Sequence, residues 1–398
     1  MSYIGSKPAD AVLETDDITD GVITTSKLAD NSVTTAKTSY SDIPHRNIII
    51  NGDMSIAQRG TSTSGVTSSG YYACDRWRAG IGIGTWTISQ DTDVPTGQGF
   101  AKSMKIDCTT ANASPSASTD FSLETKFEGQ MLQYLKKGTA NAQSLTLSFW
   151  VKSNKTGDYT LEITDSDNNR SISQSYSISS ANTWEKKTLT FAGDTTGTLD
   201  IDNAQSLALL WWLSAGSNYT SGTLQTSWGS QVTANRAVST QVNLADSTAN
   251  EFFITGIQLE AGTTASDFEF LPLDVNLRRC QRYFYVFGDR RTSGAFPIVD
   301  QKSIGLGVTH YINQCVVSIP MKVNMRTSPS IDQVSGTDFY DYYHGQASDT
   351  FDSFNGISST GEAQQIIRNT NQISASVNNC GIVYINGTDA YTAFDAEL

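Results

Sequence analysis

The sequence predicts an all-β protein with an extended N-terminal segment, a jelly-roll β-sandwich and a second β-rich domain. Charged residues make up only 17% of the 398 residues and aromatic residues make up 10%, a balance that suits strands better than long amphipathic helices. Several short runs alternate apolar and polar residues with the period of a strand. All seven tryptophans lie between Trp77 and Trp228, which indicates a central domain with its own core.

Net charge and cysteine content exclude several classes of protein. The net charge is −13 and the sequence has no basic block, so we expect no nucleic-acid partner. The apolar run 207–213 is far shorter than the ~20 residues that cross a bilayer, and no signal peptide is visible, so we expect no membrane insertion. The five cysteines lie far apart without a CxxC motif, which predicts free, buried thiols in a protein made in a reducing cytosol.

Residues 1–45 form the first predicted unit. The motif Ile23-Thr-Thr-Ser-Lys27 recurs ten residues later as Val33-Thr-Thr-Ala-Lys37. One β-branched residue in ten cannot bury a core within one chain, but it can when copies of the chain stack against each other. We therefore expect self-association as a homotrimer; a disordered Thr- and Asp-rich leader is the alternative.

Residues 46–272 form the second predicted unit, the jelly roll. Four apolar side chains alternate along one face of a strand: Leu145, Leu147, Phe149 and Val151. Further strands are expected at 159–163, 188–191 and 252–259, separated by turn sequences, and one short helix is expected at 128–137. Many short strands at this spacing are typical of a sandwich or jelly roll.

Adjacent tryptophans give a second prediction for this unit. Trp211 and Trp212 follow each other in an apparent strand, where neighbouring side chains face opposite sides. We expect one of them in the core and the other exposed or at a subunit interface.

Residues 273–398 form the third predicted unit. A helix is expected at 274–281, followed by a strand at 283–287. Further strands are expected within 308–319, at 381–385 and at the end of the chain. Two basic pairs, Arg278-Arg279 and Arg290-Arg291, flank the joint between the helix and the strand. They could contact an anionic polysaccharide, although pairing with nearby acids is the more ordinary role.

Motifs for catalysis or metal binding are not apparent in the sequence. It contains three histidines and neither a GxSxG nor an HExxH motif. The many acids could supply a glycosidase pair, but an acidic surface already explains them. Asp165-Ser-Asp-Asn-Asn169 begins like a calcium loop, but it has Arg170 and Tyr176 where that loop needs glycine and glutamate. We expect no catalytic residues, no cofactor and no metal.

The most distinctive stretch is residues 336–356. It interleaves aromatic rings with Asp, Asn, Ser and Gly, a mixture that resembles the composition of antibody-type binding loops. Exposed aromatic surface is unfavourable by ~25 cal/mol per Å², so rings left in water would indicate a ligand. The expected binding residues are Tyr340, Asp341, Tyr342, Tyr343, His344, Phe351 and Asn355. The alternative is a hairpin whose tyrosines pack at a trimer interface.

Three motifs in the middle unit resemble the galactose-binding-like jelly rolls of carbohydrate-binding modules. They are the opening Asn47-Ile-Ile-Ile-Asn-Gly-Asp-Met54, the central Ser148-Phe-Trp-Val-Lys152 and the closing Ile254-Thr-Gly-Ile-Gln-Leu-Glu260. The resemblance implies a glycan-binding fold. Such modules place acids around a structural calcium; Ser55, Gly256 and Gln258 stand at the corresponding positions here, which argues against that site.

The whole chain resembles tail-fibre proteins of marine tailed bacteriophages. The motifs that carry this resemblance are the Thr-Thr-x-Lys repeat, Tyr72-Ala-Cys-Asp-Arg-Trp77, Arg279-Cys-Gln-Arg-Tyr-Phe284 and Asp395-Ala-Glu-Leu398. It implies a homotrimeric virion protein, made in the host cytoplasm. Residues 1–45 would bind the phage tail or an adaptor, and the distal 273–398 tip would bind a host surface polysaccharide or lipopolysaccharide. A virion decoration or head fibre is the first alternative, and a polysaccharide depolymerase is the second.

Overall fold

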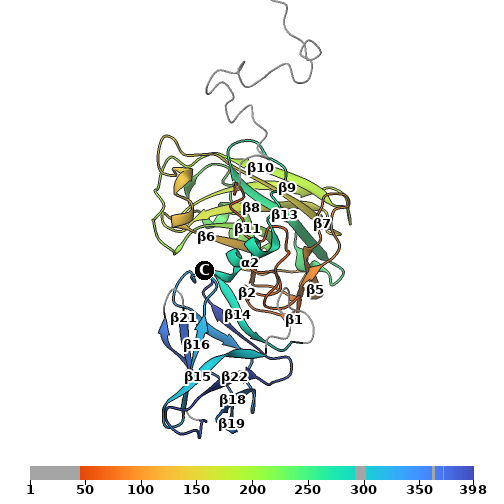
Figure 1. The fold of residues 1–398 in the computed structure, drawn as a ribbon. Helices are drawn as coiled ribbons and strands as arrows, with labels where there is room; N and C mark the ends of the chain where they lie inside the picture. Colours follow the sequence, from red (N-terminus) through yellow and green to blue (C-terminus); the bar gives the residue numbers. More distant parts are fainter. Residues whose placement is uncertain (1–44, 292–301, 361–363, 371) are drawn as a thin grey trace, which may run out of the picture. The chain divides into compact units, whose positions relative to one another are not determined.

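The computed structural model describes residues 45–291, 302–360, 364–370 and 372–398. Residues 45–398 form one compact unit built almost entirely of β-strands (Figure 1), as the sequence predicts. The repeat at 23–37 lies outside the described residues. None of the described helices is long and apolar enough to cross a membrane.

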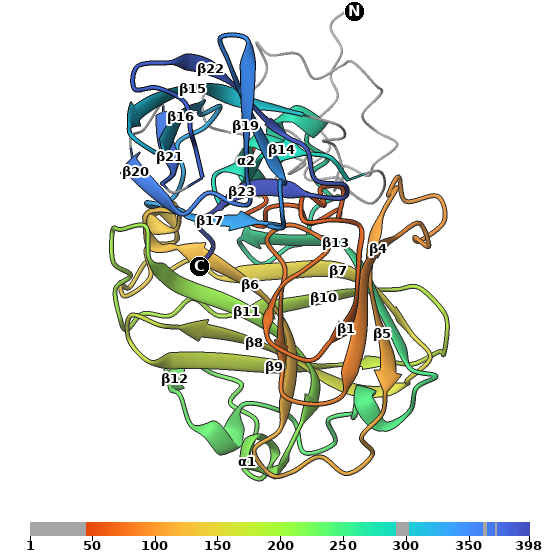
Figure 2. The same ribbon diagram turned by 90° about the horizontal axis from the view of Figure 1, so that it is seen from below.

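The first half of the described chain is a sandwich of two antiparallel sheets. One sheet has the spatial order β1 (Ser62–Val66), β4 (Thr85–Asp91), β5 (Ser103–Thr110), β13 (Glu251–Ala261), β7 (Leu145–Ser153) and β10 (Glu185–Phe191). The other has the order β12 (Gly229–Ser230), β9 (Arg170–Ile178), β8 (Gly157–Asp165), β11 (Gln205–Ala215), β6 (Asp120–Glu128), β3 (Arg78–Ile81) and β2 (Gly70–Tyr71). Figure 2 shows β6, β11, β8 and β9 side by side.

The inner faces of these two sheets share one core. The alternating side chains of β7, from Leu145 to Val151, are all buried, whereas Trp150 is partly exposed, so the predicted strand face is confirmed. Phe149 from one sheet meets Trp211 from the other edge to face, with ring centroids 5.7 Å apart. Edge-to-face pairs of this kind add to the free energy gained by burying the rings.

The segment 128–137 differs from the predicted helix. It forms two short 3-10 turns, η4 (Gly129–Met131) and η5 (Gln133–Leu135), and ends at Lys136 in a left-handed conformation with φ 52°. Gly129 lies against the main chain of Asp200, whose carbonyl oxygen would be 2.1 Å from an added Cβ atom. This close approach leaves no room for a side chain. The turns bury Leu132 and Leu135 while Tyr134 faces solvent.

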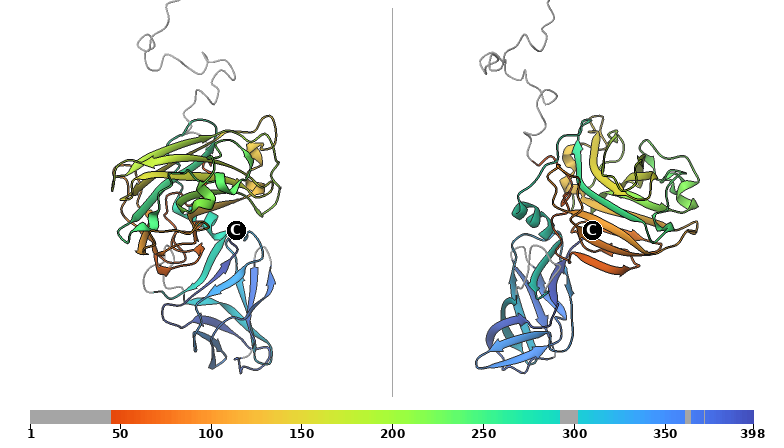
Figure 3. Two further views of the ribbon diagram at one scale, coloured as in Figure 1. Left: turned by 180° about the vertical axis from the view of Figure 1, so that it is seen from behind. Right: turned by 90° about the vertical axis from the view of Figure 1, so that its right-hand side faces the viewer.

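Helix α2 (Leu273–Gln281) follows the sandwich, as predicted, and leads into the C-terminal strands (Figure 3). A small sheet has the order β14 (Phe284–Asp289), β23 (Tyr391–Asp395) and β17 (Ser330–Gln333). A larger sheet has the order β19 (Ala347–Phe351), β18 (Tyr340–His344), β22 (Cys380–Ile385), β15 (Ser303–Tyr311), β16 (Gln314–Pro320), β21 (Gln364–Asn369) and β20 (Gly356–Thr360). Side chains from both sheets form a second core, which includes Phe287, Phe394, Val317 and Val383. We call the larger sheet the C-terminal sheet.

Two hydrogen-bonded groups connect these strands to the sandwich. Glu128 of β6 accepts hydrogen bonds from Arg282 and Tyr283, just after α2. Glu397 pairs with Arg59 and Arg76 from the sandwich. All five cysteines are free thiols in the structure, as predicted, but Cys380 is exposed and not buried.

Candidate functional site

The segment predicted to bind a ligand forms the hairpin of β18 and β19. Tyr340, Tyr342 and Phe351 are completely buried, so the expectation that these rings are exposed is wrong. Tyr340 stacks on Phe351 with ring centroids 5.1 Å apart, and the Tyr342 hydroxyl donates to the main-chain oxygen of Asn379 at 2.6 Å. Packing in the second core therefore accounts for these three aromatic residues.

The remaining predicted residues lie on the outside of the hairpin or at its base. Tyr343 is 52% exposed, His344 lies 3.1 Å from a carboxylate oxygen of Asp349, and Asn355 donates to the Thr370 hydroxyl. Asp341 is on the same face as Tyr343 but is shielded from water. The structure does not gather these side chains into one pocket, and their role in binding stays a prediction.

Both adjacent tryptophans are buried, so the prediction that one is exposed is wrong. Trp211 enters the core, while Trp212 lies on the outer face of β11. That face is covered by residues 216–243, which include α1 (Ser217–Thr220) and the 3-10 turn η6 (Thr233–Asn235). The guanidinium of Arg236 lies over the Trp212 ring, and both side chains bond to Glu162.

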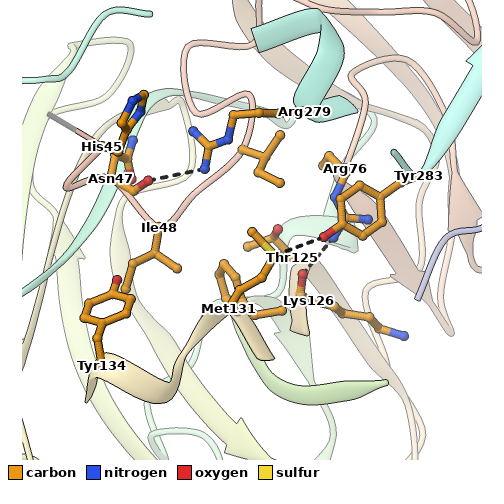
Figure 4. Close-up of a pocket in the computed structure, with 12 residues that line it drawn as sticks. His45, Asn47, Ile48, Arg76, Thr125, Lys126, Met131, Tyr134, Arg279 and Tyr283 are labelled. Atoms are coloured by element: carbon orange, nitrogen blue, oxygen red, sulfur yellow. Dashed lines mark hydrogen bonds between the residues drawn. The ribbon is translucent and has the colours of Figure 1, made fainter. Parts of the chain in front are cut away.

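A pocket of about 240 Å³ lies beside α2; we call it the α2 pocket. Its apolar lining consists of Ile48, Ile50, Phe127, Met131, Tyr134 and Tyr283. Its polar lining consists of His45, Asn47, Arg76, Thr125, Lys126 and Arg279. Figure 4 shows Arg279 turned toward Asn47 and Tyr283 turned toward Met131. Tyr134 and Met131 remain 51% and 39% exposed, so they are accessible to a ligand.

Arg279 is the most distinctive charge in this pocket. It donates one long hydrogen bond, 3.4 Å, to the main-chain oxygen of Asn47, and within the described ranges it forms no ion pair with a carboxylate. Burial lowers the pKa of its guanidinium from the ordinary value, because removal from water disfavours the charged form. Arg291, by contrast, pairs with Asp289, which is the ordinary role expected for the basic pairs.

Lys126 adds a second cation to the pocket wall. Burial is the main reason that the pKa of its amine is lowered, and the neighbouring Arg78 lowers it further. The amine donates to the main-chain oxygen of Leu398 at 3.0 Å. Figure 4 shows the Lys126 amine directed away from Arg279, so Arg279 is the cation that an anionic or strongly accepting group in the pocket would stabilise.

The floor of the pocket is held by the Glu128 cluster. The Glu128 carboxylate is completely buried and accepts hydrogen bonds from Arg282, Tyr283 and Gln130. These bonds, those of Arg282 first, hold the pKa of the carboxyl below its ordinary value against the effect of burial. The same bonds fix the ring of Tyr283, whose hydroxyl reaches the Met131 sulfur at 3.5 Å.

The residues at the position of the carbohydrate-module calcium site do not fit a cation. The Glu260 carboxylate accepts hydrogen bonds from the main-chain N–H and the hydroxyl of Ser266, and Arg46 lies 4.0 Å from it. Gln258 donates into the same group. A guanidinium and amide donors occupy the place where ligand oxygens are needed. In the described part of the chain, no group of three or more His, Cys, Asp or Glu residues could hold a metal ion.

No protein-family model matches this chain, and no curated protein matches it. Several solved structures resemble part of it. The enzymatically active domain of tailspike protein 4 from bacteriophage CBA120 is 14% identical with a TM-score of 0.30, over 55% of this chain and 22% of that one. A family 11 carbohydrate-binding module from Clostridium thermocellum is 14% identical with a TM-score of 0.23, over 50% of this chain and 98% of that one.

A putative sugar-binding protein from Bacteroides thetaiotaomicron is 12% identical with a TM-score of 0.29, over 54% of this chain and 99% of that one. The chain spans about a fifth of the length of the tailspike that it matches. These likenesses are too weak to assign a family or a function.

Proposed function

We propose that this chain is a non-catalytic tail fibre of a tailed bacteriophage that binds a bacterial surface glycan as a homotrimer. The observation that supports glycan binding best is the α2 pocket. It combines an exposed tyrosine ring, which suits the C–H face of a sugar, with an arginine that has no carboxylate partner in the described residues. Concave sites of this kind, apolar with a few convergent polar groups, are typical of small-ligand binding.

The charges of the pocket favour an acidic sugar. Arg279 and Lys126 line it, and no Asp or Glu is among its described lining residues. A uronic acid or a phosphate-substituted sugar would place its anion on the Arg279 guanidinium, where paired N–H donors match two acceptor oxygens. The ring of such a sugar would lie against Tyr134.

The same lining supports binding without hydrolysis. Glycoside hydrolysis ordinarily needs two carboxyl groups on either side of the scissile bond, and the α2 pocket offers none from its described lining. A reducing-sugar assay on the polysaccharide that the protein binds checks this directly. Release of reducing ends would replace the proposal with a depolymerase.

The test of glycan binding uses the full chain on a panel of immobilised bacterial polysaccharides and lipopolysaccharides. Tyr134→Ala and Arg279→Ala should each weaken retention at least tenfold, and the matched control Arg278→Ala, on the exposed side of α2, should not. If the two pocket variants are retained as strongly as the original chain, the binding site lies elsewhere, and the β18–β19 hairpin is the next candidate.

The role in the virion rests on the sequence resemblance. Residues 1–45 would attach the fibre to the tail or to an adaptor, and the trimer would present three weak sites together, which raises avidity. An image of the particle with this chain labelled separates a tail fibre from a head fibre or decoration.

A further inference from the structure

The C-terminal sheet has an exposed outer face that is strongly apolar. Cross-strand pairs place Leu306 beside Ile382 and Val308 beside Val316, and Ile366 continues the face onto β21. Leu306 is 72% exposed, and Ile382 and Val308 are each more than a third exposed. Together these five residues line an open depression of about 460 Å³. We call them the outer apolar face.

Unlike the inner face, this face has no cover among the residues that the structure describes. On the inner side, Val317, Ile367 and Val383 pack in the second core. The outer side chains alternate with these along the same strands and have similar aliphatic character. A contiguous apolar patch on a sheet ordinarily marks a surface that another molecule covers. A sugar is a poor occupant, because aliphatic side chains offer its hydroxyls no hydrogen bonds.

The two flanks of the face carry opposite charges. On the β21 flank, Arg368 projects from the outer side beside Val316, and its buried Nε atom has no hydrogen-bond partner among the described residues. On the β18 flank, Asp341 lies on the outer side opposite Tyr384, and none of the described residues donates a hydrogen bond to its carboxylate. Burial, together with the nearby Asp338, raises the pKa of Asp341, as expected for a carboxyl without a cation.

We propose that the outer apolar face packs against the same face of two further copies of this chain, in a closed ring of three. The proposal rests on the homotrimer of the proposed function and adds the surface that forms it. In a head-to-tail ring, the β21 flank of each copy meets the β18 flank of the next. Arg368 of each copy then lies toward Asp341 of the next, so the opposite charges favour a second copy over an unrelated partner.

The first experiment measures mass by light scattering at micromolar concentration. The original chain should give three times 43.1 kDa. Leu306→Asp should shift the mass toward the single chain or raise the concentration needed for assembly at least tenfold, because a carboxylate would be buried in the interface. Because Leu306 is exposed in the single chain, thermal unfolding of the Leu306→Asp variant should stay cooperative. Ile201→Asp, 79% exposed in a sandwich loop, is the matched control and should leave the mass unchanged.

The second experiment detects the contact even if residues 1–45 also hold the trimer. Tyr343→Cys on the β18 flank and Arg368→Cys on the β21 flank are combined in a Cys380→Ser chain, because Cys380 is the exposed native thiol. A short bis-maleimide should link the double variant into two- and three-chain species on a denaturing gel, and should not link either single variant.

The results of these two experiments distinguish a failure of the proposed interface from a failure of the proposed function. A trimeric Leu306→Asp chain whose double-cysteine form does not cross-link overturns the interface. Cross-linking that stops at two chains overturns the ring of three. If the Leu306→Asp variant stays trimeric but is no longer retained by the polysaccharide, the outer apolar face binds a glycan. That result also overturns the proposal. A single-chain original protein overturns both the ring and the homotrimer, while glycan binding can still be measured on the polysaccharide panel.

Discussion

In the sandwich, the outer face of the sheet around β11 is covered by residues 216–243 of the same chain, whereas none of the described residues covers the outer face of the C-terminal sheet. The first cover buries Trp212 and gives Glu162 a cation, Arg236. The second face keeps Leu306 and Ile382 exposed. The sandwich thus covers its own outer face at β11, while the C-terminal sheet has one buried face and, among the described residues, one exposed apolar face. Four predictions test this contrast.

The largest effect is expected in the closed core of the sandwich. Leu147 is completely buried and lies between Leu189 and Leu259 on the neighbouring strands. Leu147→Asp buries an unpaired charge, so it should cost more than about 5 kcal/mol and abolish cooperative unfolding of the sandwich. Near-ultraviolet circular dichroism during heating measures this. Thr188→Asp on exposed β10 is the control, and an unchanged melting curve for Leu147→Asp would show that the strand face is misassigned.

The next prediction tests whether the C-terminal sheet is buried on one face only. Tyr342 faces the second core and Tyr343, the next residue, faces outward. Tyr342→Ala should lower the free energy of unfolding by about 3–5 kcal/mol through a cavity and a lost hydrogen bond, and Tyr343→Ala should change it by less than about 1 kcal/mol. Urea unfolding at one fixed protein concentration compares the two. Equal effects would contradict the one-sided core.

A third prediction concerns the contact between the two regions. Glu128→Ala removes the buried carboxylate that binds Arg282 and Tyr283, leaving both donors without their carboxylate acceptor. The cost should be about 3 kcal/mol, and the sandwich and C-terminal strands should unfold in separate steps. Because the folded pKa of Glu128 is depressed, its stabilisation is present above the unfolded value and is lost as pH falls through the folded pKa. One unchanged transition in differential scanning calorimetry would contradict the coupling.

The smallest expected effect is a pH dependence of the free energy of unfolding that comes from Asp75. Burial raises the pKa of its carboxyl to about 6. A raised pKa means that the contribution of Asp75 is fully present below the unfolded value of 3.8 and is lost as pH rises through about 6. The loss should be at most about 3 kcal/mol. Unfolding free energies of the original chain and of Asp75→Asn should diverge between pH 4 and 6 and run parallel above pH 7. Parallel curves throughout would show that Asp75 ionises normally.

The sequence predicted those features that depend on local periodicity. The alternation at 145–151 identified a buried strand face, because residues two positions apart on a strand lie on the same face and all four of these are apolar. The same period did not identify which face of β18 is buried. Tyr340 and Tyr342 lie on one face and Asp341 and Tyr343 on the other, and because both faces carry tyrosine, polarity does not distinguish them. Trp212 was misjudged because residues 216–243 return to cover it. Contacts at such separations leave no local pattern in a sequence.

The α2 pocket could not be predicted for the same reason. Its main side chains, from Asn47, Tyr134 and Arg279, come from three distant segments. The one sequence feature that could have pointed to this pocket was the pair of adjacent basic residues, Arg278 and Arg279, in a short helix. Sequence alone could not tell that one of them pairs with no described acid and lines a pocket.

The pairing of Arg76 with Glu397 has a consequence for the order of events during synthesis. The two residues are 321 positions apart, which a ribosome covers in roughly 15–65 s at 5–20 residues per second. During that interval the guanidinium beside Trp77 has no carboxylate at residue 397 to neutralise it. The edge of the sandwich that holds Arg76 therefore lacks this ion pair until residue 397 has been made, whereas β4 and β5 can pair long before.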